Sequence, residues 1–211
     1  MKICTWNTCG DPTTNTNKAG VLGTLWHSCD IILLQECGNL SNVPAVLTGA
    51  NVIHEYQAGA FNPRCSTALL SKAVPDSSET VYSPSGTGRS VIVAAFDGVL
   101  VGTLHAVSGG VGAQDLRFAV INAVGSDQPW VIGGDFNVTP GSAALSASRT
   151  TMNFGSSSRP ITASWKAPSG PTQTSGGRLD YFVYNGVTVT GVTRHHSQGG
   201  SDHKPVYCDV S

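Results

Sequence analysis

Five short polar motifs carry the side chains that could do chemistry in this chain. They are Trp6-Asn7, Gln35-Glu36, Leu104-His105, Gly133-Gly134-Asp135-Phe136-Asn137 and Ser201-Asp202-His203. Each lies at the end of a strand-like apolar run, and strands of one sheet can bring such ends to a single edge. Acids, amides and imidazoles gathered there are the groups that a metal-dependent phosphodiester-cleaving site needs.

Glu36 ends the continuous apolar run that begins at Ile31, which predicts a buried strand. A carboxylate at the end of such a strand can bind a hard cation such as Mg2+, which takes oxygen ligands and usually one or two protein carboxylates. A solvent-exposed strand end is the alternative interpretation, and Glu36 taken alone favours that alternative.

Asp135 and Asn137 follow the apolar run from Trp130 to Ile132 and two glycines. Residues two apart in an extended segment point to the same face. An acid placed there can hold or deprotonate a water, and the amide can donate a hydrogen bond to a phosphate oxygen. The alternative is an ordinary turn, but the apolar Phe136 between two polar residues favours a functional role.

His203 follows Asp202 directly, so the two side chains project in different directions and have separate roles. A catalytic histidine needs another acid to fix its tautomer, and Asp180 is the candidate. A lone histidine is more often structural, and the same alternative applies to His105. His195 and His196 match no zinc-binding pattern, so we expect them in a surface loop.

Apolar runs bounded by turn residues predict the strands that must position these motifs. They span Ile3 to Trp6, Ile31 to Gln35, Ser66 to Leu70, Ser90 to Phe96, Val99 to His105, Trp130 to Ile132, Tyr181 to Tyr184, Val187 to Val192 and Pro205 to Val210. Asp97-Gly98 between two of these runs indicates a hairpin over residues 90 to 105.

Helical spacing of apolar residues predicts helices over Asn17 to Cys29, Gly112 to Val124 and Ala143 to Arg149. Residues 153 to 178 are rich in Ser, Gly, Pro and Thr and are predicted to form one long loop, with Trp165 as an anchor. Residues 1 to 211 show no linker or repeat, so the sequence predicts a single mixed α/β domain.

Composition excludes little and favours some settings. The net charge is -1, although residues 136 to 211 carry six Lys/Arg against three Asp/Glu, which suits either a modest phosphate-attracting face or an ordinary solvated surface. No apolar run spans a bilayer, so stable membrane insertion is not expected. Low charge with abundant Ser, Thr, Gly and Asn is typical of a secreted bacterial-type protein, while a cytoplasmic location stays open because no signal peptide is visible.

Two local features bear on the compartment. Cys9 and Cys37 each follow a candidate site residue, and we expect that they can pair as a disulfide in an oxidising compartment. Asn137-Val138-Thr139 is a glycosylation sequon within the candidate site, and a glycan there would block chemistry. A catalytic Asn137 therefore argues against passage through a eukaryotic glycosylating pathway.

The ordered series of motifs resembles the endonuclease/exonuclease/phosphatase superfamily of deoxyribonuclease I, and most closely the catalytic B subunit of cytolethal distending toxins. The resemblance rests also on Asp30 to Gly38, on His105 to Gly110 and on Thr174 to Tyr181. It implies an α/β fold of four layers, an α/β/β/α sandwich whose two packed sheets are flanked by helices. The chain is shorter than typical members, which leaves its substrate preference open.

The resemblance also implies roles for individual residues. Glu36 would bind Mg2+, or Mn2+, with Asn7 and Asp202 near it, while His105 and His203 would bracket the scissile phosphate. Asp180 would orient His203, and Asp135 with Asn137 would position the water and the phosphate. Arg64 and Arg89 fall where the toxin subunits place phosphate-contacting arginines.

Three functions are compatible with these residues. The leading hypothesis is a Mg2+-dependent endonuclease acting on DNA, genotoxin-like, with a toxin-delivery subunit as a partner. The second is a phosphoinositide phosphatase that uses the same site, and the third is a non-catalytic binding module of the same fold. The sequence does not indicate an oligomeric state.

Overall fold

The computed structural model describes residues 1–55, 65–82, 89–108, 128–140, 151–154 and 161–211. Its helices are α1 (Thr16–Ser28) and α2 (Val43–Val46), and its strands are β1 (Lys2–Asn7), β2 (Ile31–Gln35), β3 (Asn51–Glu55), β4 (Thr67–Ser71), β5 (Ser77–Tyr82), β6 (Ser90–Phe96), β7 (Val99–His105), β8 (Trp130–Asp135), β9 (Thr151–Phe154), β10 (Ile161–Lys166), β11 (Asp180–Asn185), β12 (Val189–Arg194) and β13 (Val206–Val210). The helices predicted over Gly112 to Val124 and Ala143 to Arg149 fall outside the described residues.

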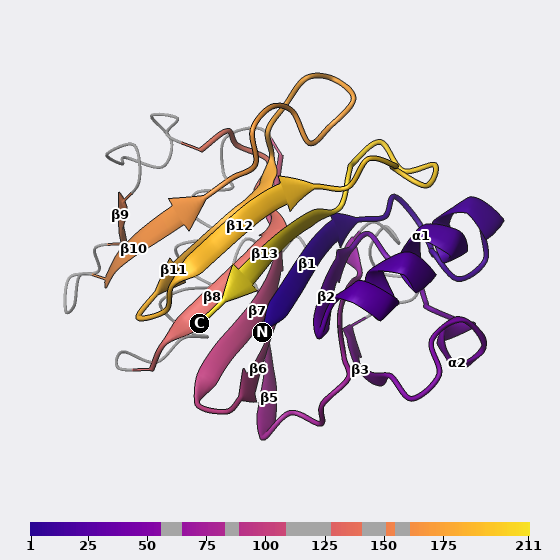
Figure 1. Cartoon of the computed structure of the whole chain (residues 1–211), viewed down its shortest axis with the longest axis horizontal. Coiled ribbons are helices and arrows are strands. Elements are labelled where there is room, and N and C mark those ends of the chain that lie inside the picture. Colours follow the sequence, from indigo (N-terminus) through magenta and orange to yellow (C-terminus); the bar gives the residue numbers. More distant parts are fainter. Residues whose placement is uncertain (56–64, 83–88, 109–127, 141–150, 155–160) are drawn as a thin grey trace.

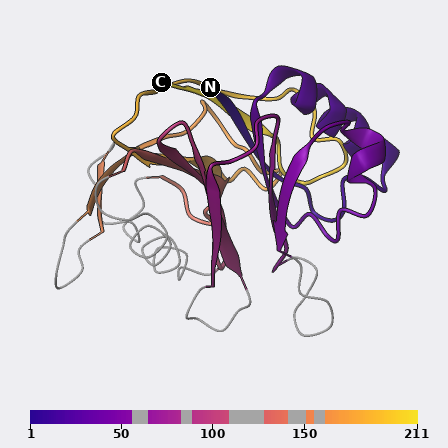
Figure 2. The same cartoon turned by 90° about the horizontal axis from the view of Figure 1, so that it is seen from below.

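Two mixed sheets face each other, which confirms the predicted sandwich (Figures 1 and 2). The six-stranded sheet has the order β12-β13-β1-β2-β4-β3, and the seven-stranded sheet has the order β5-β6-β7-β8-β11-β10-β9. Helices α1 and α2 lie on the side of the six-stranded sheet that faces away from the other sheet. No helix in the described ranges is long and apolar enough to cross a membrane.

Alternation along the strands builds a core on each face of the six-stranded sheet. Ile31 and Leu33 of β2 point inward and pack with Phe182 and Val101 of the opposite sheet. The intervening residues of β2 point outward and pack against α1. One strand thus contributes to two cores because successive side chains point to opposite faces.

A polar seam joins the two sheets near the end at which these strands finish. Gln35 is fully buried, and its amide nitrogen donates hydrogen bonds to the hydroxyls of Thr5 at 3.1 Å and Thr103 at 2.9 Å. The hydroxyls of Thr67 and Ser90 also meet across the sheets, at 2.9 Å. These bonds hold the two sheets in a fixed position because a buried polar group is costly when it is unpaired.

The prediction of one long loop over residues 153 to 178 is wrong. Ile161–Lys166 forms β10, which pairs antiparallel with β11, so Trp165 lies opposite Val183 inside the sheet. Its residues alternate between apolar and polar, as in a half-buried strand, but the Ser-, Gly- and Pro-rich sequence around them obscures this signal. Strands β3 and β5 were also missed, because polar residues are frequent in both and do not alternate with apolar ones. Pairing with neighbours from distant parts of the chain, rather than local propensity, decides such strands.

The expected disulfide between Cys9 and Cys37 is absent. All six cysteines lie in described parts of the chain, and none of them forms a disulfide. Cys37 is buried on the helix-facing side of the six-stranded sheet, where its thiol interacts with the Ser66 side chain. Cys9, by contrast, is half-buried in the turn after β1.

Candidate active site

Strand register brings three of the predicted side chains to one face and one end of the seven-stranded sheet. His105, the last residue of β7, is paired with Asp135, the last residue of β8. Asp135 is in turn paired with Asp180, the first residue of β11. Side chains of laterally paired residues point to the same face. All three are almost fully buried.

Two glycines before Asp135 let the strands approach closely. A Cβ atom at Gly133 would lie 2.6 Å from the Phe182 ring, and one at Gly134 would lie 1.9 Å from the carbonyl oxygen of Leu104. No other residue type fits at Gly134 while β7 and β8 stay in register. Gly133 and Gly134 therefore allow the close strand packing that places Asp135 beside His105.

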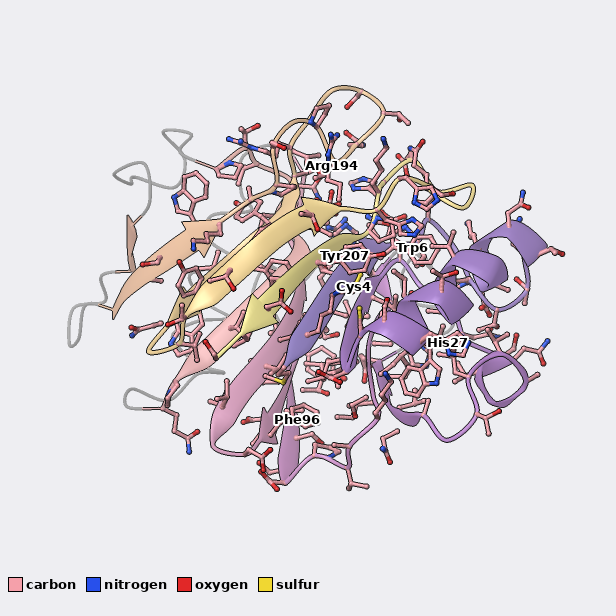
Figure 3. The ribbon with its side chains drawn as sticks, in the orientation of Figure 1. Cys4, Trp6, His27, Phe96, Arg194 and Tyr207 are labelled. Carbon is pink, nitrogen blue, oxygen red and sulfur yellow. The ribbon has the colours of Figure 1, made fainter. Side chains whose placement is uncertain are left out.

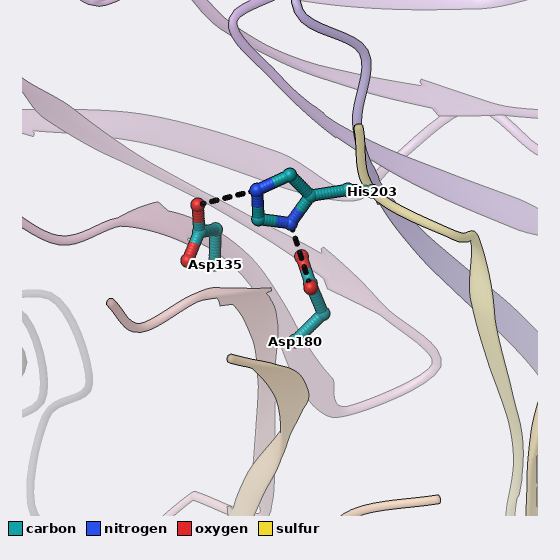
Figure 4. A group of neighbouring side chains, drawn as sticks. All are labelled: Asp135, Asp180 and His203. Atoms are coloured by element: carbon teal, nitrogen blue, oxygen red, sulfur yellow. Dashed lines mark hydrogen bonds and ion pairs between the residues drawn. The ribbon is translucent and has the colours of Figure 1, made fainter. Parts of the chain in front are cut away.

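His203 reaches this group from the loop before β13, and its Nδ1 atom lies 2.8 Å from Oδ2 of Asp180 (Figure 4). A carboxylate accepts hydrogen bonds only, so Nδ1 carries the proton. The other ring nitrogen, Nε2, faces Oδ2 of Asp135 at 3.7 Å, which is an ion-pair distance rather than a hydrogen bond. The structure thus places His203 between the two acids.

The His203 main chain is also anchored. Its N–H donates to the Ser201 hydroxyl at 3.0 Å, and its carbonyl accepts a bond from the Trp6 indole at 3.2 Å. The Ser201 hydroxyl in turn donates to the carbonyl of Asn7 at 2.7 Å. Figure 3 shows Trp6 toward one end of the strands and Phe96 toward the other, so this anchor lies at the site end.

Asn7 and Glu36 bring the six-stranded sheet into the site. The Asn7 amide nitrogen donates to Asp135 Oδ2 at 3.0 Å and to Glu36 Oε1 at 3.3 Å. His105 Nε2 lies near the same two carboxylates, 3.6 Å from Glu36 Oε1 and 3.8 Å from Asp135 Oδ2. Glu36 and Asp135 therefore share an amide and an imidazole as neighbours.

The backbone at Glu36 adopts the left-handed region, with φ of 51°. Few residues other than glycine adopt this conformation. It is held by bonds to the Glu36 carbonyl, from the Gly10 N–H at 2.7 Å and from the Thr8 hydroxyl at 3.2 Å. The turn after β1 thus fixes the direction in which the Glu36 side chain leaves β2.

Asn137 and Arg89 meet at a single carbonyl. The Asn137 amide nitrogen donates to the Ala106 carbonyl at 2.7 Å, and the Arg89 guanidinium donates to the same oxygen. The Asn137 N–H donates to Asp135 Oδ1 at 2.9 Å. Arg89 therefore contacts the segment directly after His105, while Arg64 falls outside the described residues.

Asp202 is the predicted residue that stands apart. Its side chain is exposed, and Oδ2 lies 3.5 Å from the Gln173 side-chain nitrogen. It is close enough that its charge helps to raise the pKa of His203. Asp202 therefore lies at the rim of the site.

The surroundings of two residues of the site, Asp135 and His203, raise their pKa values. Burial, and then the Asp180 carboxylate, raises the pKa of the Asp135 carboxyl to about 7. Burial lowers the pKa of His203, but the hydrogen bond and charge of Asp180 outweigh it and raise the pKa to about 9. Near neutral pH, His203 is a charged donor and Asp135 can accept a proton.

The donor set fits a hard divalent cation. The potential ligand atoms of Asp135, Asp180 and His203 lie within 4.8 Å of one another, but His203 Nδ1 is already committed to Asp180. Mg2+ prefers oxygen, which favours the carboxylates of Glu36 and Asp135. Asp180 Oδ1 is buried without a hydrogen-bond partner among the described residues, a cost that a nearby cation would offset.

Sequence reasoning assigned no role to two residues that support the site, Thr172 and Ser201, although Ser201 belongs to one of the five motifs. Thr172 and Ser201 are buried, and their hydroxyls bond to the main chain beside Asp180 and His203. The signal available was a hydroxyl two residues before His203, since serine commonly bonds to a backbone N–H two residues on. Thr172 gave no such signal, because it lies eight residues from Asp180.

The chain matches a known protein family over most of its length. Residues 4–203 match the model of the Endonuclease/Exonuclease/phosphatase family. No curated protein sequence matches the chain.

Solved structures share the fold at low sequence identity. The cytolethal distending toxin from Actinobacillus actinomycetemcomitans is 21% identical, with 98% of this chain and 97% of that chain covered and a TM-score of 0.69. The 3'-5' exonuclease NExo from Neisseria meningitidis is 17% identical, with 99% of each chain covered and a TM-score of 0.71. Humanized D. rerio TDP2 is 16% identical, with 100% and 98% covered and a TM-score of 0.70. These matches confirm the deoxyribonuclease I-like fold that the motifs predicted.

Proposed function

Because the chain belongs to the endonuclease/exonuclease/phosphatase family, we propose that it is a divalent-metal-dependent endonuclease that hydrolyses phosphodiester bonds in DNA. One observation carries the proposal: His203 is held by Asp180 at 2.8 Å while its free edge faces Asp135, the residue paired with His105. Two imidazoles and a proton-accepting acid at one point suit hydrolysis of a phosphate ester.

Each residue has a definite task in this proposal. Asp135, with its pKa of about 7, accepts the proton of the attacking water. His203 in its charged form and His105 donate hydrogen bonds to phosphate oxygens as negative charge grows there. Asn137 orients the phosphate next to Asp135.

The cation belongs beside Glu36, where the Asn7 amide donates to both Glu36 and Asp135, and Asp202 lies at the rim. When bound, Mg2+ or Mn2+ supplies positive charge to the phosphate oxygens. DNA is the favoured substrate because the motifs most resemble the toxin subunits. A further structural neighbour, the Neisseria 3' phosphatase, is described as bound to a product DNA hairpin.

Plasmid nicking tests the proposal. Wild-type protein should convert supercoiled plasmid to the open-circular form in Mg2+ but not in excess chelator. His203→Ala and His105→Ala should each lower the rate by about 100-fold to 1,000-fold, as expected when one preorganised donor is removed. Wild-type-like nicking by both variants, with their folds verified by circular dichroism, would refute the role assignment.

A phosphatase assay distinguishes the second hypothesis, a phosphoinositide phosphatase, from the nuclease proposal. The family includes phosphatases, and the same acids and imidazoles can serve a phosphomonoester. Phosphate release from phosphoinositide micelles, measured at the enzyme concentration used for nicking, should be the slower reaction. Faster release from the micelles would replace the nuclease proposal, and no turnover of either substrate in Mg2+ or Mn2+ would favour a non-catalytic binding module.

A further inference from the structure

Thr172 contacts the segments that carry both members of the Asp180–His203 pair. It lies in the turn before β11 and is 1% exposed. Its hydroxyl oxygen accepts hydrogen bonds from the N–H groups of Leu179 at 2.9 Å and Asp180 at 3.1 Å. Its carbonyl accepts one from the Lys204 N–H at 2.8 Å. One residue is thus bonded next to the acid and next to the imidazole.

The Asp180 N–H needs this acceptor because the sheet offers none. β10 ends at Lys166, which pairs with Phe182, so the ladder stops before it reaches Asp180. On the other edge of β11, the Leu179 carbonyl is already bonded to the Phe136 N–H at 2.9 Å. The Thr172 hydroxyl therefore replaces the missing strand at the residue whose carboxylate holds His203.

The segment that contains Thr172 also pairs with the loop of His203. The Lys204 N–H bonds to the Thr172 carbonyl at 2.8 Å, and the Thr174 N–H bonds to the Asp202 carbonyl at 2.9 Å. Gln173, between them, is bridged to His203. This short antiparallel pair fixes His203 relative to Thr172, as the hydroxyl fixes Asp180 relative to Thr172.

We propose that Thr172 is a positioning residue that sets the distance between Asp180 and His203, and so the direction in which His203 Nε2 faces the substrate. The inference rests on the proposed hydrolytic function, in which His203 contacts the phosphate. Thr172 acts only through Asp180 and His203, since its hydroxyl is buried and committed to two backbone N–H groups. Removal of the hydroxyl leaves those N–H groups unpaired and lets the start of β11 shift.

The test is a double-mutant cycle with Asp180→Asn. Thr172→Val keeps the shape of the side chain but removes the hydrogen-bond acceptor. We expect kcat for nicking of supercoiled plasmid to fall about 10-fold to 100-fold, the usual effect of losing a residue that orients a reactive group. KM should change little. Thr172→Ser should restore most of the rate, and Thr190→Val, the same change at an exposed position of β12, should have no effect.

Coupling distinguishes positioning from a general loss of stability. If Thr172 acts through Asp180, Thr172→Val should cost little more once Asp180→Asn is present, whereas independent effects multiply. Full multiplication of the two losses would overturn the proposal.

Amide hydrogen exchange provides a readout that needs no substrate. The N–H groups of Leu179 and Asp180 should exchange faster in Thr172→Val than in wild type, with β1 and β2 amides unchanged. Unchanged exchange at both positions would also overturn the proposal. If the wild type turns over no substrate, the hydrolytic function fails, while exchange still reports whether Thr172 holds Asp180.

Discussion

Asp135 and Asp180 are direct partners in the antiparallel register of β8 and β11, and both are at most 2% exposed. Two buried acids on one face repel when both are ionised, and His203 supplies only one compensating charge. Burial and this repulsion raise the pKa of Asp135 to about 7. The repulsion that makes Asp135 a proton acceptor near neutral pH therefore also lowers the stability of the fold.

Asp135→Asn should stabilise the protein at alkaline pH when a chelator removes divalent ions. The folded pKa of Asp135 lies above its ordinary value of 3.8, so the stability gained from its protonated form is full below about pH 3.8. That stability is lost as the pH rises through about 7. The asparagine variant cannot ionise, so its melting temperature should exceed that of the wild type at pH 8.

The comparison has an internal control. Near pH 4 most of Asp135 is protonated in the folded wild type, so the two melting temperatures should converge. Asp209→Asn, which removes an exposed acid of β13, should give no such pH-dependent difference. A variant that is less stable than wild type at pH 8 in chelator would show that the Asp135 charge is favourable in the fold.

Glu36→Gln should weaken the response to metal without loss of fold. The change removes one negative charge beside Asn7 and His105 and keeps the size of the side chain. We expect the Mg2+ concentration that gives half-maximal nicking to rise at least about tenfold, as when a residue of a metal site is changed. Glu79→Gln on the exposed face of β5 is the matched control. Equal Mg2+ dependence of wild type and Glu36→Gln would remove Glu36 from the metal site.

Thiol titration checks the absence of a disulfide. Six thiols should react with an aromatic disulfide reagent in denaturant, and Cys9 and Cys65, which are half-buried, should be the two that react fast in the native protein. Burial raises the pKa of the Cys37 thiol to about 12, which leaves almost no thiolate at neutral pH. A count of four in denaturant would mean that one disulfide is present, and peptide mapping would then show whether it joins Cys9 to Cys37.

Much of the framework of this site could be predicted because its signals are local. The run that ends at Gln35 is continuous and apolar, the run that ends at His105 is mostly apolar, and both are strands in the structure. The pairing of His203 with Asp180 followed from the chemical need of a histidine for an acid, and the two lie 2.8 Å apart. The chemical need of His203 for an acid thus predicted a contact that no pattern of apolar residues indicates.

What escaped prediction depends on distant parts of the chain. β10 alternates apolar and polar residues over only six positions within a Ser-, Gly- and Pro-rich stretch, and its pairing with β11 and β9 on either side makes it a strand. The role of the Thr172 hydroxyl likewise exists only because β10 stops short of Asp180. Sequence-local reasoning has no access to where a neighbouring strand ends.

Gly134 offers the sharpest test of how the strands hold the site. Gly134→Ala would place a methyl group 1.9 Å from the Leu104 carbonyl oxygen, and backbone of a neighbouring strand cannot move aside as a side chain can. β7 must then separate from β8, which also moves His105 away from Asp135. We expect a loss of at least about 3 kcal/mol, or roughly 6 °C or more in melting temperature.

Gly20→Ala, in α1 with no atom within 4 Å of the new methyl group, should instead stabilise by about 0.5–1 kcal/mol, because alanine loses less backbone entropy in a helix. Comparable melting temperatures for Gly134→Ala and wild type would mean that β7 and β8 are not as close as the structure has them, and that the placement of His105 beside Asp135 needs another explanation.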